Sequence, residues 1–364
     1  MPLSRFQPEH YATLLADKVA KTEALLAPFS PPAAEVFPSP REAFRLRAEF
    51  RIWHQGDQLD YVMFHPDAPR DPVAVNHFPI AGPRIQALMA PLRERLTVSP
   101  LLRRKLFQVE FLTTTSGDAL VTLVYHRPLE DDWQQAAEQL AADLGIALVG
   151  RSRKQKRVIG RDHVTESLEV EGHTWHWKQV EQGFTQPNGA VNREMLHWAC
   201  RSARGLGGDL LELYCGNGNF TLPLSRHFDT VIATELAKTS VRAAQHNLAQ
   251  NAVSNVQLIR LAAEEVTQAI RGERAFRRLA DLPQALGDYD LRTVFVDPPR
   301  AGLDPATEAM VQGFDNILYV SCNPQTLAGN LQRLTESHRI AAFALFDQFP
   351  YTDHMECGVL LQRR

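Results

Sequence analysis

The sequence is poor in the residues that build metal centres, disulfides and membrane spans. It contains four cysteines among 364 residues, and no two of them form a CxxC pair. This usage offers no zinc, iron–sulfur or disulfide framework, and it fits a reducing compartment. No apolar run approaches the ~18 residues of a membrane helix, and residues 1–15 hold no apolar segment of signal-peptide length. We therefore expect a cytoplasmic protein with no bound metal and no membrane span.

The sequence also lacks an excess of positive charge. Its formal net charge is −3, so overall charge does not indicate a nucleic-acid partner. Basic residues nevertheless gather in two segments, 93–105 and 151–161. Binding to phosphate depends on the local density of cations and not on net charge. Each segment can therefore be either an RNA contact or an ordinary solvated face, and the sequence leaves both interpretations open.

The length and composition indicate a globular protein with more than one domain. A chain of 364 residues that is 44% hydrophobic and 22% charged exceeds one ordinary core. We expect a helix at 8–26 followed by a proline-rich linker to residue 38, an α+β domain at 39–180 and an α/β domain at 181–364. In the last domain strands alternate with helices from residue 209, which predicts a doubly wound, mostly parallel sheet.

The α+β domain carries the features of an RNA-binding sheet. From residue 44 to 53 apolar residues alternate with polar ones, which predicts a half-buried strand with arginines on its exposed face. A hairpin at 107–115 and 119–125 and a helix at 129–144 follow. Arginines hold phosphates and aromatic rings stack on bases, although an ordinary solvated face remains the alternative. The candidate RNA contacts are Arg45, Arg47, Arg51, Phe107 and His126.

A glycine turn in the α/β domain predicts a nucleotide-like cofactor. Residues 209–214 read as a strand that enters the turn Cys215-Gly216-Asn217-Gly218-Asn219. Glycines allow close approach of the backbone to a ligand, and Glu235 follows at the spacing of a ribose-binding carboxylate. Thr221 stands where a dinucleotide fingerprint has its third glycine or alanine, and the turn lacks the lysine of a P-loop. Both departures favour S-adenosylmethionine over NAD or ATP.

The segment 316–324 predicts a nucleophile. An apolar strand ends at Ser321-Cys322-Asn323, and Pro324 then opens a helix. Ligands of open α/β sheets bind outside the carboxyl ends of the strands, so Cys322 is presented to a site. A small buried core thiol is the alternative interpretation.

A thiol and a methyl donor together favour methylation of a pyrimidine carbon. Asp297-Pro298-Pro299 is similar to the segments of enzymes that methylate exocyclic amines, but such enzymes need no thiol. Addition of a thiolate to C6 of uracil makes C5 nucleophilic, and a general base must then remove the C5 proton. We assign this base to Glu356, with Asp353 and His354 as alternatives, and Arg300 could stabilise the enolate oxygen or hold a phosphate.

These residues carry a family resemblance. Phe184-Thr185-Gln186-Pro187-Asn188, residues 212–220, residues 295–302, Ser321-Cys322-Asn323-Pro324 and residues 354–358 resemble the adenosylmethionine-dependent RNA uracil-5 methyltransferases. The segment 45–53 resembles the transfer-RNA branch of that family, so the likeness extends over nearly the whole chain. It implies a Rossmann-like methyltransferase domain with an antiparallel last strand.

The resemblance implies roles for individual residues and a substrate. Cys322 matches the nucleophile of the family and Glu356 its base. The residues that match its S-adenosylmethionine contacts are Gln186, Tyr214, Asn219, Glu235 and Asp297. The implied product is 5-methyluridine at position 54 of the T-loop, which requires the base to leave its stack. We therefore expect the T-arm of tRNA as the partner of a monomeric enzyme, with Phe107 aiding base flipping.

Some alternatives remain open. Ribosomal-RNA members of the family typically add a TRAM barrel and a four-cysteine cluster, and this chain has no such cysteine cluster, which favours tRNA. Uracil-5 methylation of another structured RNA, an amine or cytosine-C5 methyltransferase, and an RNA-binding or remodelling protein with a vestigial methyltransferase fold are the rivals. A dehydrogenase is a poor alternative, because Thr221 stands in place of the third glycine or alanine of a dinucleotide fingerprint.

Overall fold

The chain folds into two compact units. The computed structural model describes residues 5–65 and 68–364. Pro40–Ser167 and Gln179–Gly189 form the N-terminal unit, whereas Glu9–Ser39, Leu168–Lys178 and Ala190–Arg364 form the C-terminal unit. The unit boundary after Ser39 lies close to the one expected at 38. Residues 9–39 belong to the C-terminal unit, and the chain also passes between the units after Ser167, after Lys178 and after Gly189.

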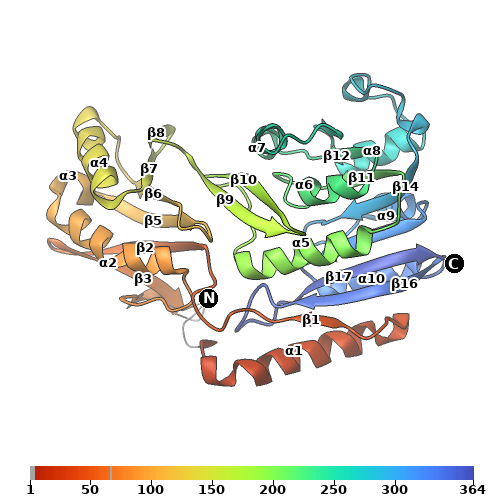
Figure 1. Ribbon diagram of the computed structural model, residues 1–364. Coiled ribbons are helices and arrows are strands. Elements are labelled where there is room, and N and C mark those ends of the chain that lie inside the picture. Colours follow the sequence, from red (N-terminus) through yellow and green to blue (C-terminus); the bar gives the residue numbers. More distant parts are fainter. Residues whose placement is uncertain (1–4, 66–67) are drawn as a thin grey trace. The chain divides into compact units, whose positions relative to one another are not determined.

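The C-terminal unit contains an eight-stranded sheet (Figure 1). Seven strands were expected as a mostly parallel, doubly wound sheet, and this prediction is confirmed. The last strand is antiparallel to both of its neighbours, as the resemblance implied. In spatial order the strands are β1 (Glu35–Phe37), β16 (His338–Phe346), β17 (Glu356–Arg363), β15 (Asn316–Ser321), β14 (Leu291–Val296), β11 (Asp209–Leu213), β12 (Val231–Thr234) and β13 (Val256–Ile259).

Both faces of this sheet are buried, which explains why its strands read as apolar runs in the sequence. Alternate residues enter different cores: Val294 and Val296 pack on one side and Phe295 on the other. The first core also takes side chains from α1 (Tyr11–Leu26), α8 (Ala263–Ile270), α9 (Pro305–Val311) and α10 (Pro324–Leu334). The second takes side chains from α5 (Gly189–Ala203), α6 (Thr221–Leu224), α7 (Lys238–Gln250) and the two-stranded sheet of β9 (His163–Val170) and β10 (His173–Val180).

The N-terminal unit is a seven-stranded sheet with three helices (Figure 1). The predicted hairpin is present as β5 and β6, which pair antiparallel. The strand order is β4 (Ala68–Ala74), β3 (Gln58–His65), β2 (Arg47–Gln55), β5 (Leu106–Thr113), β6 (Ala119–Tyr125), β7 (Ala147–Ser152) and β8 (Gln155–Ile159). The helices are α2 (Pro83–Val98), α3 (Pro100–Arg103) and α4 (Asp131–Leu144). Sequence reasoning missed α2, α3, β1, β4, β7, β8 and β9.

The expected strand at 44–53 starts later than predicted, and two helices near the site have irregular features. The buried positions of α1 are Tyr11, Lys18, Thr22 and Leu26, so its inner face is partly polar. Strand β2 begins at Arg47 because the amides just before it bond elsewhere: Arg45 N–H donates to Ile80 O and Leu46 N–H to Pro187 O. The helix after the glycine turn ends at Leu224 and continues as one 3₁₀ turn.

No helix within residues 5–65 and 68–364 has the length and hydropathy that a membrane crossing requires.

Candidate active site

The predicted site residues of the C-terminal unit end neighbouring strands of one sheet. From β17 to β12, in spatial order, these strands present Glu356, Cys322, Asp297, Tyr214 and Glu235 at one edge. All the strands in this row except β17 run parallel, so their carboxyl ends meet there, and antiparallel β17 brings its first residue to the same edge. The topology thus gathers residues that are up to 142 positions apart in sequence (Tyr214 to Glu356).

Strand pairing sets Cys322 beside Glu356. The antiparallel register of β15 and β17 ends with Ser321 opposite Cys357. Cys322 follows Ser321 and Glu356 precedes Cys357, so these two residues come next on either side. Directly opposed residues of an antiparallel pair lie close enough for their side chains to interact. The sequence predicted both roles but could not show this pairing, because it depends on the register of two strands.

The environment of Cys322 disfavours the free thiolate. Cys322 is half-buried, between the end of β15 and the start of α10. Burial raises the pKa of its thiol to about 11, and the carboxylates of Glu356 and Asp297 contribute in the same direction. The positive charge of Arg300 acts in the opposite direction and lowers this pKa. Near neutral pH the group is therefore mostly the protonated thiol, which is a weaker nucleophile than the thiolate.

Glu356 has the environment of a general base. Its side chain is 4% exposed, and burial, with the charge of Asp297, raises its pKa to about 8. Burial likewise raises the pKa of Asp297 to about 7. Carboxyl groups tuned toward neutral pH are suited to proton transfer. The alternatives Asp353 and His354 are both exposed, and burial and the nearby cations Arg300 and Lys18 lower the pKa of His354.

One face of α10 holds the loop that follows Asp297. Asn323 Nδ2 and Thr326 Oγ1 both donate to Arg300 O, at 3.1 and 3.3 Å. Asn330 accepts from Leu303 N–H at 3.1 Å and donates to Leu303 O at 3.2 Å. These three residues follow helical spacing, so they face the same side. The loop is thereby fixed to the helix that follows Cys322.

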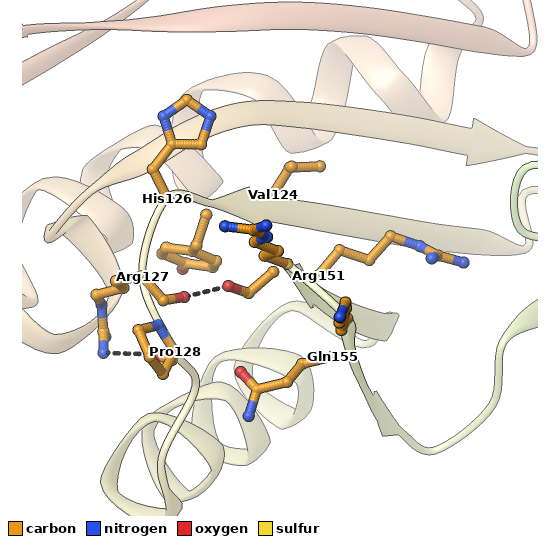
Figure 2. A pocket seen from close by; sticks show the side chains of 10 residues that line it. Val124, His126, Arg127, Pro128, Arg151 and Gln155 are labelled. Carbon is orange, nitrogen blue, oxygen red and sulfur yellow. Dashed lines mark hydrogen bonds between the residues drawn. The ribbon is translucent and has the colours of Figure 1, made fainter.

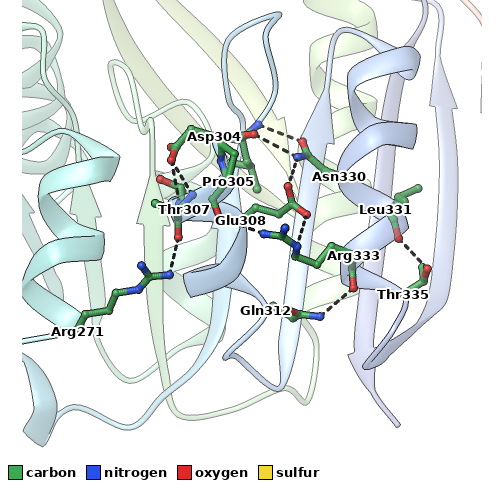
Figure 3. Close-up of polar contacts among 12 residues, drawn as sticks. Arg271, Asp304, Pro305, Thr307, Glu308, Gln312, Asn330, Leu331, Arg333 and Thr335 are labelled. Atoms are coloured by element: carbon green, nitrogen blue, oxygen red, sulfur yellow. Dashed lines mark hydrogen bonds and ion pairs between the residues drawn. The ribbon is translucent and has the colours of Figure 1, made fainter.

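The inner end of this face is a buried polar network (Figure 3). Asn330 also accepts from Tyr319 Oη at 2.9 Å and donates to Glu308 Oε2 at 2.9 Å. Asn330 Oδ1 would lie 2.8 Å from a Cβ at Gly302, whose φ is +77°. A side chain at Gly302 would therefore collide with the network. No individual role was predicted for Gly302 or Asn330 from the sequence.

The glycine turn fits a nucleoside-type cofactor. Gly216 has φ +58° and a Cβ there would meet no atom within 4 Å, so the turn is open to a ligand. Glu235 accepts from Gly216 N–H at 3.0 Å and from Ala237 N–H at 2.7 Å, which fixes its carboxylate while leaving lone pairs for hydroxyl groups. Asn219 is held by a reciprocal amide pair with Asn192, with distances of 3.0 and 2.9 Å.

A second acidic residue beside the turn makes no hydrogen bond of ordinary geometry. Glu212 is fully buried, and neither of its carboxylate oxygens has such a partner within the described chain. Burial raises its pKa to about 8, the nearby Thr221 hydroxyl opposes this shift, and the charge of Asp297 adds to it. An unpaired buried carboxylate is costly, and its retention here fits a ligand that carries positive charge. Gln186 lies in Gln179–Gly189 of the N-terminal unit, and its role toward the cofactor stays a prediction.

A cavity of about 370 Å³ opens beside Cys322. Arg300 and His354 line it, and an Arg300 Nη atom lies 3.2 Å from His354 Nδ1. Its other walls come from the first turn of α10 and, unexpectedly, from α1 through Lys18, Lys21, Thr22 and Leu25. Sequence reasoning assigned no role to α1.

The N-terminal unit brings three of the five predicted RNA contacts together. The Arg51 guanidinium lies 3.5 Å above the centroid of the Phe107 ring, and the Phe107 and His126 rings are 4.1 Å apart. Arg45 and Arg47 are instead partly buried and brace the backbone. Arg45 Nε donates to Arg47 O at 2.9 Å, Arg47 Nη1 donates to Gly183 O at 2.8 Å, and burial lowers both pKa values.

A basic cavity of about 940 Å³ adjoins His126 (Figure 2). It lies between residues 124–128 and 151–155, and its cationic side chains are Arg127, Arg151, Arg153 and Lys154. Arg127 donates to three backbone carbonyls and Arg151 pairs with Glu181, whereas Arg153 and Lys154 are exposed. The second basic segment of the sequence therefore reaches the same region as the aromatic stack.

One group of possible metal ligands occurs within the described residues. Atoms of Glu171, Cys200 and His227 lie within 4.8 Å of one another. Glu171 already bonds His227 Nε2 at 3.1 Å and Arg204 at 2.5 Å. A carboxylate that is paired with a guanidinium is a poor cation ligand, so this group does not support a metal site. The expectation of no bound metal stays a prediction.

Comparisons with known proteins agree with this geometry. The sequence model described as tRNA (Uracil-5-)-methyltransferase matches residues 10–364. The chain belongs to the tRNA (uracil-5-)-methyltransferase family. The family predicted from the sequence is therefore confirmed.

Individual relatives cover the whole chain. The chain is 57% identical to the tRNA/tmRNA (uracil-C(5))-methyltransferase of Azoarcus sp. (strain BH72), over 100% of this chain and 99% of that one. It is 56% identical to the enzyme of the same name from Stutzerimonas stutzeri (strain A1501), over 100% of both chains. Among solved structures, Pyrococcus abyssi tRNA (uracil-54, C5)-methyltransferase in complex with S-adenosyl-L-homocysteine superposes with a TM-score of 0.73 at 19% identity. The superposition covers 96% of this chain and 83% of the Pyrococcus chain. This similarity confirms the predicted methyltransferase fold.

Proposed function

We propose that this protein transfers a methyl group from S-adenosylmethionine to C5 of uridine 54 in the T-loop of tRNA. The observation that supports the proposal is that Cys322 and Glu356 each lie one residue beyond the paired Ser321 and Cys357, at the strand edge that also holds Asp297 and the cofactor turn. Methylation of uracil C5 in tRNA or tmRNA is the activity in the names of its relatives. Position 54 appears in the name of the Pyrococcus protein and in the family resemblance.

The cofactor is S-adenosylmethionine, which supplies an electrophilic methyl group on a sulfonium centre. Glu235 fits its ribose hydroxyls, and the Asn219 amide fits its polar groups. Burial raises the pKa values of the Glu212 and Asp297 carboxyl groups to about 8 and about 7, and a cationic ligand beside them would stabilise their ionised forms.

The chemistry of the protein's own residues then follows in order. The Cys322 thiolate forms a bond to C6 of uracil, and the π electrons move to C5 and O4 as an enolate. After C5 has gained the methyl group, the Glu356 carboxylate removes the C5 proton. The electrons of that C–H bond re-form the C5–C6 double bond, and the C6–S bond breaks to release the thiolate. Arg300, which lines the Cys322 cavity, is placed to stabilise the enolate oxygen or a phosphate.

The RNA-binding surface is proposed to include the stack of Arg51, Phe107 and His126. A guanidinium and two rings in series offer stacking to an unstacked base. The exposed cations Arg153 and Lys154 of the adjacent cavity would contact backbone phosphates. Arg45 and Arg47 contribute less in this proposal, because each already donates to a backbone carbonyl.

A trapping experiment tests the proposal. A T-arm hairpin that carries 5-fluorouridine at the target position is incubated with the protein and S-adenosylmethionine. Because fluorine cannot leave as a proton does, the C6–S bond should persist as a denaturation-resistant complex whose RNA maps to Cys322. Cys322→Ala should form no complex yet keep its affinity for the cofactor.

Two results would overturn parts of the proposal. If normal tRNA is methylated but no complex forms, the Cys322 mechanism is wrong. If ribosomal RNA is modified and the T-arm is not, the chemistry stands and the substrate is wrong.

A further inference from the structure

The first helix forms part of the cavity that holds the nucleophile. Its residues Lys18, Lys21, Thr22 and Leu25 line the cavity beside Cys322 and Arg300. They are spaced i, i+3, i+4 and i+7, so one face of α1 is turned toward the site. Figure 1 shows α1 running along the sheet on the side of β1 and α10.

A buried polar cluster fixes this helix in place. Lys18 Nζ forms an ion pair of 2.5 Å with Asp347, whose side chain is 1% exposed, and also donates to Phe349 O at 3.1 Å. Tyr11 Oη donates to the other oxygen of Asp347 at 2.8 Å. Asp347 and Phe349 begin the loop that leads to His354 and Glu356. The cluster therefore ties α1 to the chain segment that carries the proposed base.

The fixed helix leaves one cation exposed at the cavity. The charge of Lys18 is neutralised by Asp347, whereas Lys21 is exposed and forms no ion pair within residues 5–65 and 68–364. The same holds for Arg300, whose guanidinium lies against His354. Asp353 is the acidic residue of the lining, and it too is exposed. Two cations that form no ion pair within the described residues thus line the cavity beside Cys322.

We propose that Lys21 of α1 and Arg300 together bind a backbone phosphate next to the target nucleotide. The inference rests on the proposed function, because only a nucleic-acid substrate brings a phosphate to this cavity. Arg300 presents a planar fork and Lys21 a point charge, and both groups bind phosphate oxygens. Through this contact, α1 is part of the substrate site and not merely a support of the sheet.

The test compares RNA binding and turnover of Lys21→Gln, Lys21→Arg and Arg339→Gln. Arg339 is an exposed cation at the opposite end of β16 from Asp347, so its loss is a control for a change in net charge. Lys21→Gln should weaken binding of an unmodified T-arm hairpin and raise its KM by roughly three- to tenfold. The slope of log Kd against log salt should fall by about 0.7 to 0.9, the value of one phosphate contact. Affinity for S-adenosylmethionine and kcat at saturating RNA should stay within about twofold of wild type.

The controls separate this role from others. Lys21→Arg should restore binding and Arg339→Gln should leave the salt slope unchanged. An unchanged RNA affinity and salt slope in Lys21→Gln would overturn the proposal. So would an unchanged affinity together with a shifted pH profile of Cys322 alkylation measured without RNA, because Lys21 would then act on the thiol. If the wild-type protein neither binds nor methylates the hairpin, the proposed function itself fails.

Discussion

The two units differ in the hydrogen bonding of their buried carboxylates. In the N-terminal unit, Glu166 is 2% exposed and accepts hydrogen bonds from Thr115 N–H, from Thr115 Oγ1 and from Ser167 N–H. In the C-terminal unit, Glu212 is equally buried, and its carboxylate has no hydrogen-bond partner in the described chain. Glu356 is also buried there, and its pKa is raised to about 8. A fold keeps an unsatisfied buried acid only where another demand outweighs its cost, so Glu212 marks a functional position, and the raised pKa of Glu356 points to the same site.

The largest expected effect is the loss of methyl-transfer rate on substitution of Glu356, which substitution of Glu166 should not cause. Glu356→Gln should lower the rate of methyl transfer by about 10²- to 10⁴-fold, because proton removal from C5 loses its base. The covalent RNA complex should accumulate even with ordinary uridine. Initial rates with tRNA and denaturing gels measure both effects.

The matched variant is Glu166→Gln. It should destabilise the protein by about 1–3 kcal/mol, since bonds tailored to a carboxylate are lost, while activity per folded molecule stays near that of wild type. Normal turnover in Glu356→Gln would place the base elsewhere.

The next effect concerns the N-terminal unit. Phe107→Ala should weaken T-arm binding by about 1–3 kcal/mol, because it removes the central ring of the stack between Arg51 and His126. Cofactor affinity should not change. Val73→Ala, which truncates an exposed apolar residue of the same sheet, is the control for filter-binding measurements. Full activity of Phe107→Ala on tRNA would remove Phe107 from the proposed RNA surface.

A smaller effect appears in the stability of the cofactor-free protein. A carboxyl group whose pKa rises on folding is more protonated in the folded state, so its contribution to stability is lost as pH rises. For Glu212 and Glu356 the loss spans pH 4.5 to about 8. Glu356→Gln should flatten the fall in unfolding free energy by up to about 1.4 kcal/mol per pH unit. Urea titrations from pH 5 to 8 measure it, with exposed Glu336→Gln as a control; an identical slope in Glu356→Gln would contradict the raised pKa.

The smallest effect is a shift in the reactivity of Cys322. The Glu356 charge helps to raise the pKa of this thiol. Glu356→Gln should therefore move the alkylation of Cys322 by iodoacetamide to lower pH. Mass spectrometry of the Cys322 peptide resolves it from the three buried cysteines. No shift would mean that the two side chains do not interact.

The success of sequence reasoning also differs between the units. In the C-terminal unit the mostly parallel sheet was predicted, with one strand at 209–214 and another that ends at Ser321, because a two-faced parallel sheet gives apolar runs separated by helices. In the N-terminal unit β2, β5, β6 and α4 were predicted, but α2 was not. Its sequence contains Pro91 and three arginines, and its helical form depends on packing through Leu88, Leu92 and Leu96.

The sequence by itself determined the methyltransferase fold, the family, and the residue types at the strand ends. These follow from local patterns: strands that alternate with helices, a glycine turn, and a cysteine placed before a helix. Only the tertiary structure decided which residues meet. The register of β15 and β17 sets Glu356 beside Cys322, the pairing of β1 with β16 draws the proline-rich stretch into the sheet, and Asp347 fixes α1 against the site. Such contacts join residues that are tens to hundreds of positions apart, and their energies depend on burial and strand pairing that no local pattern of the chain records.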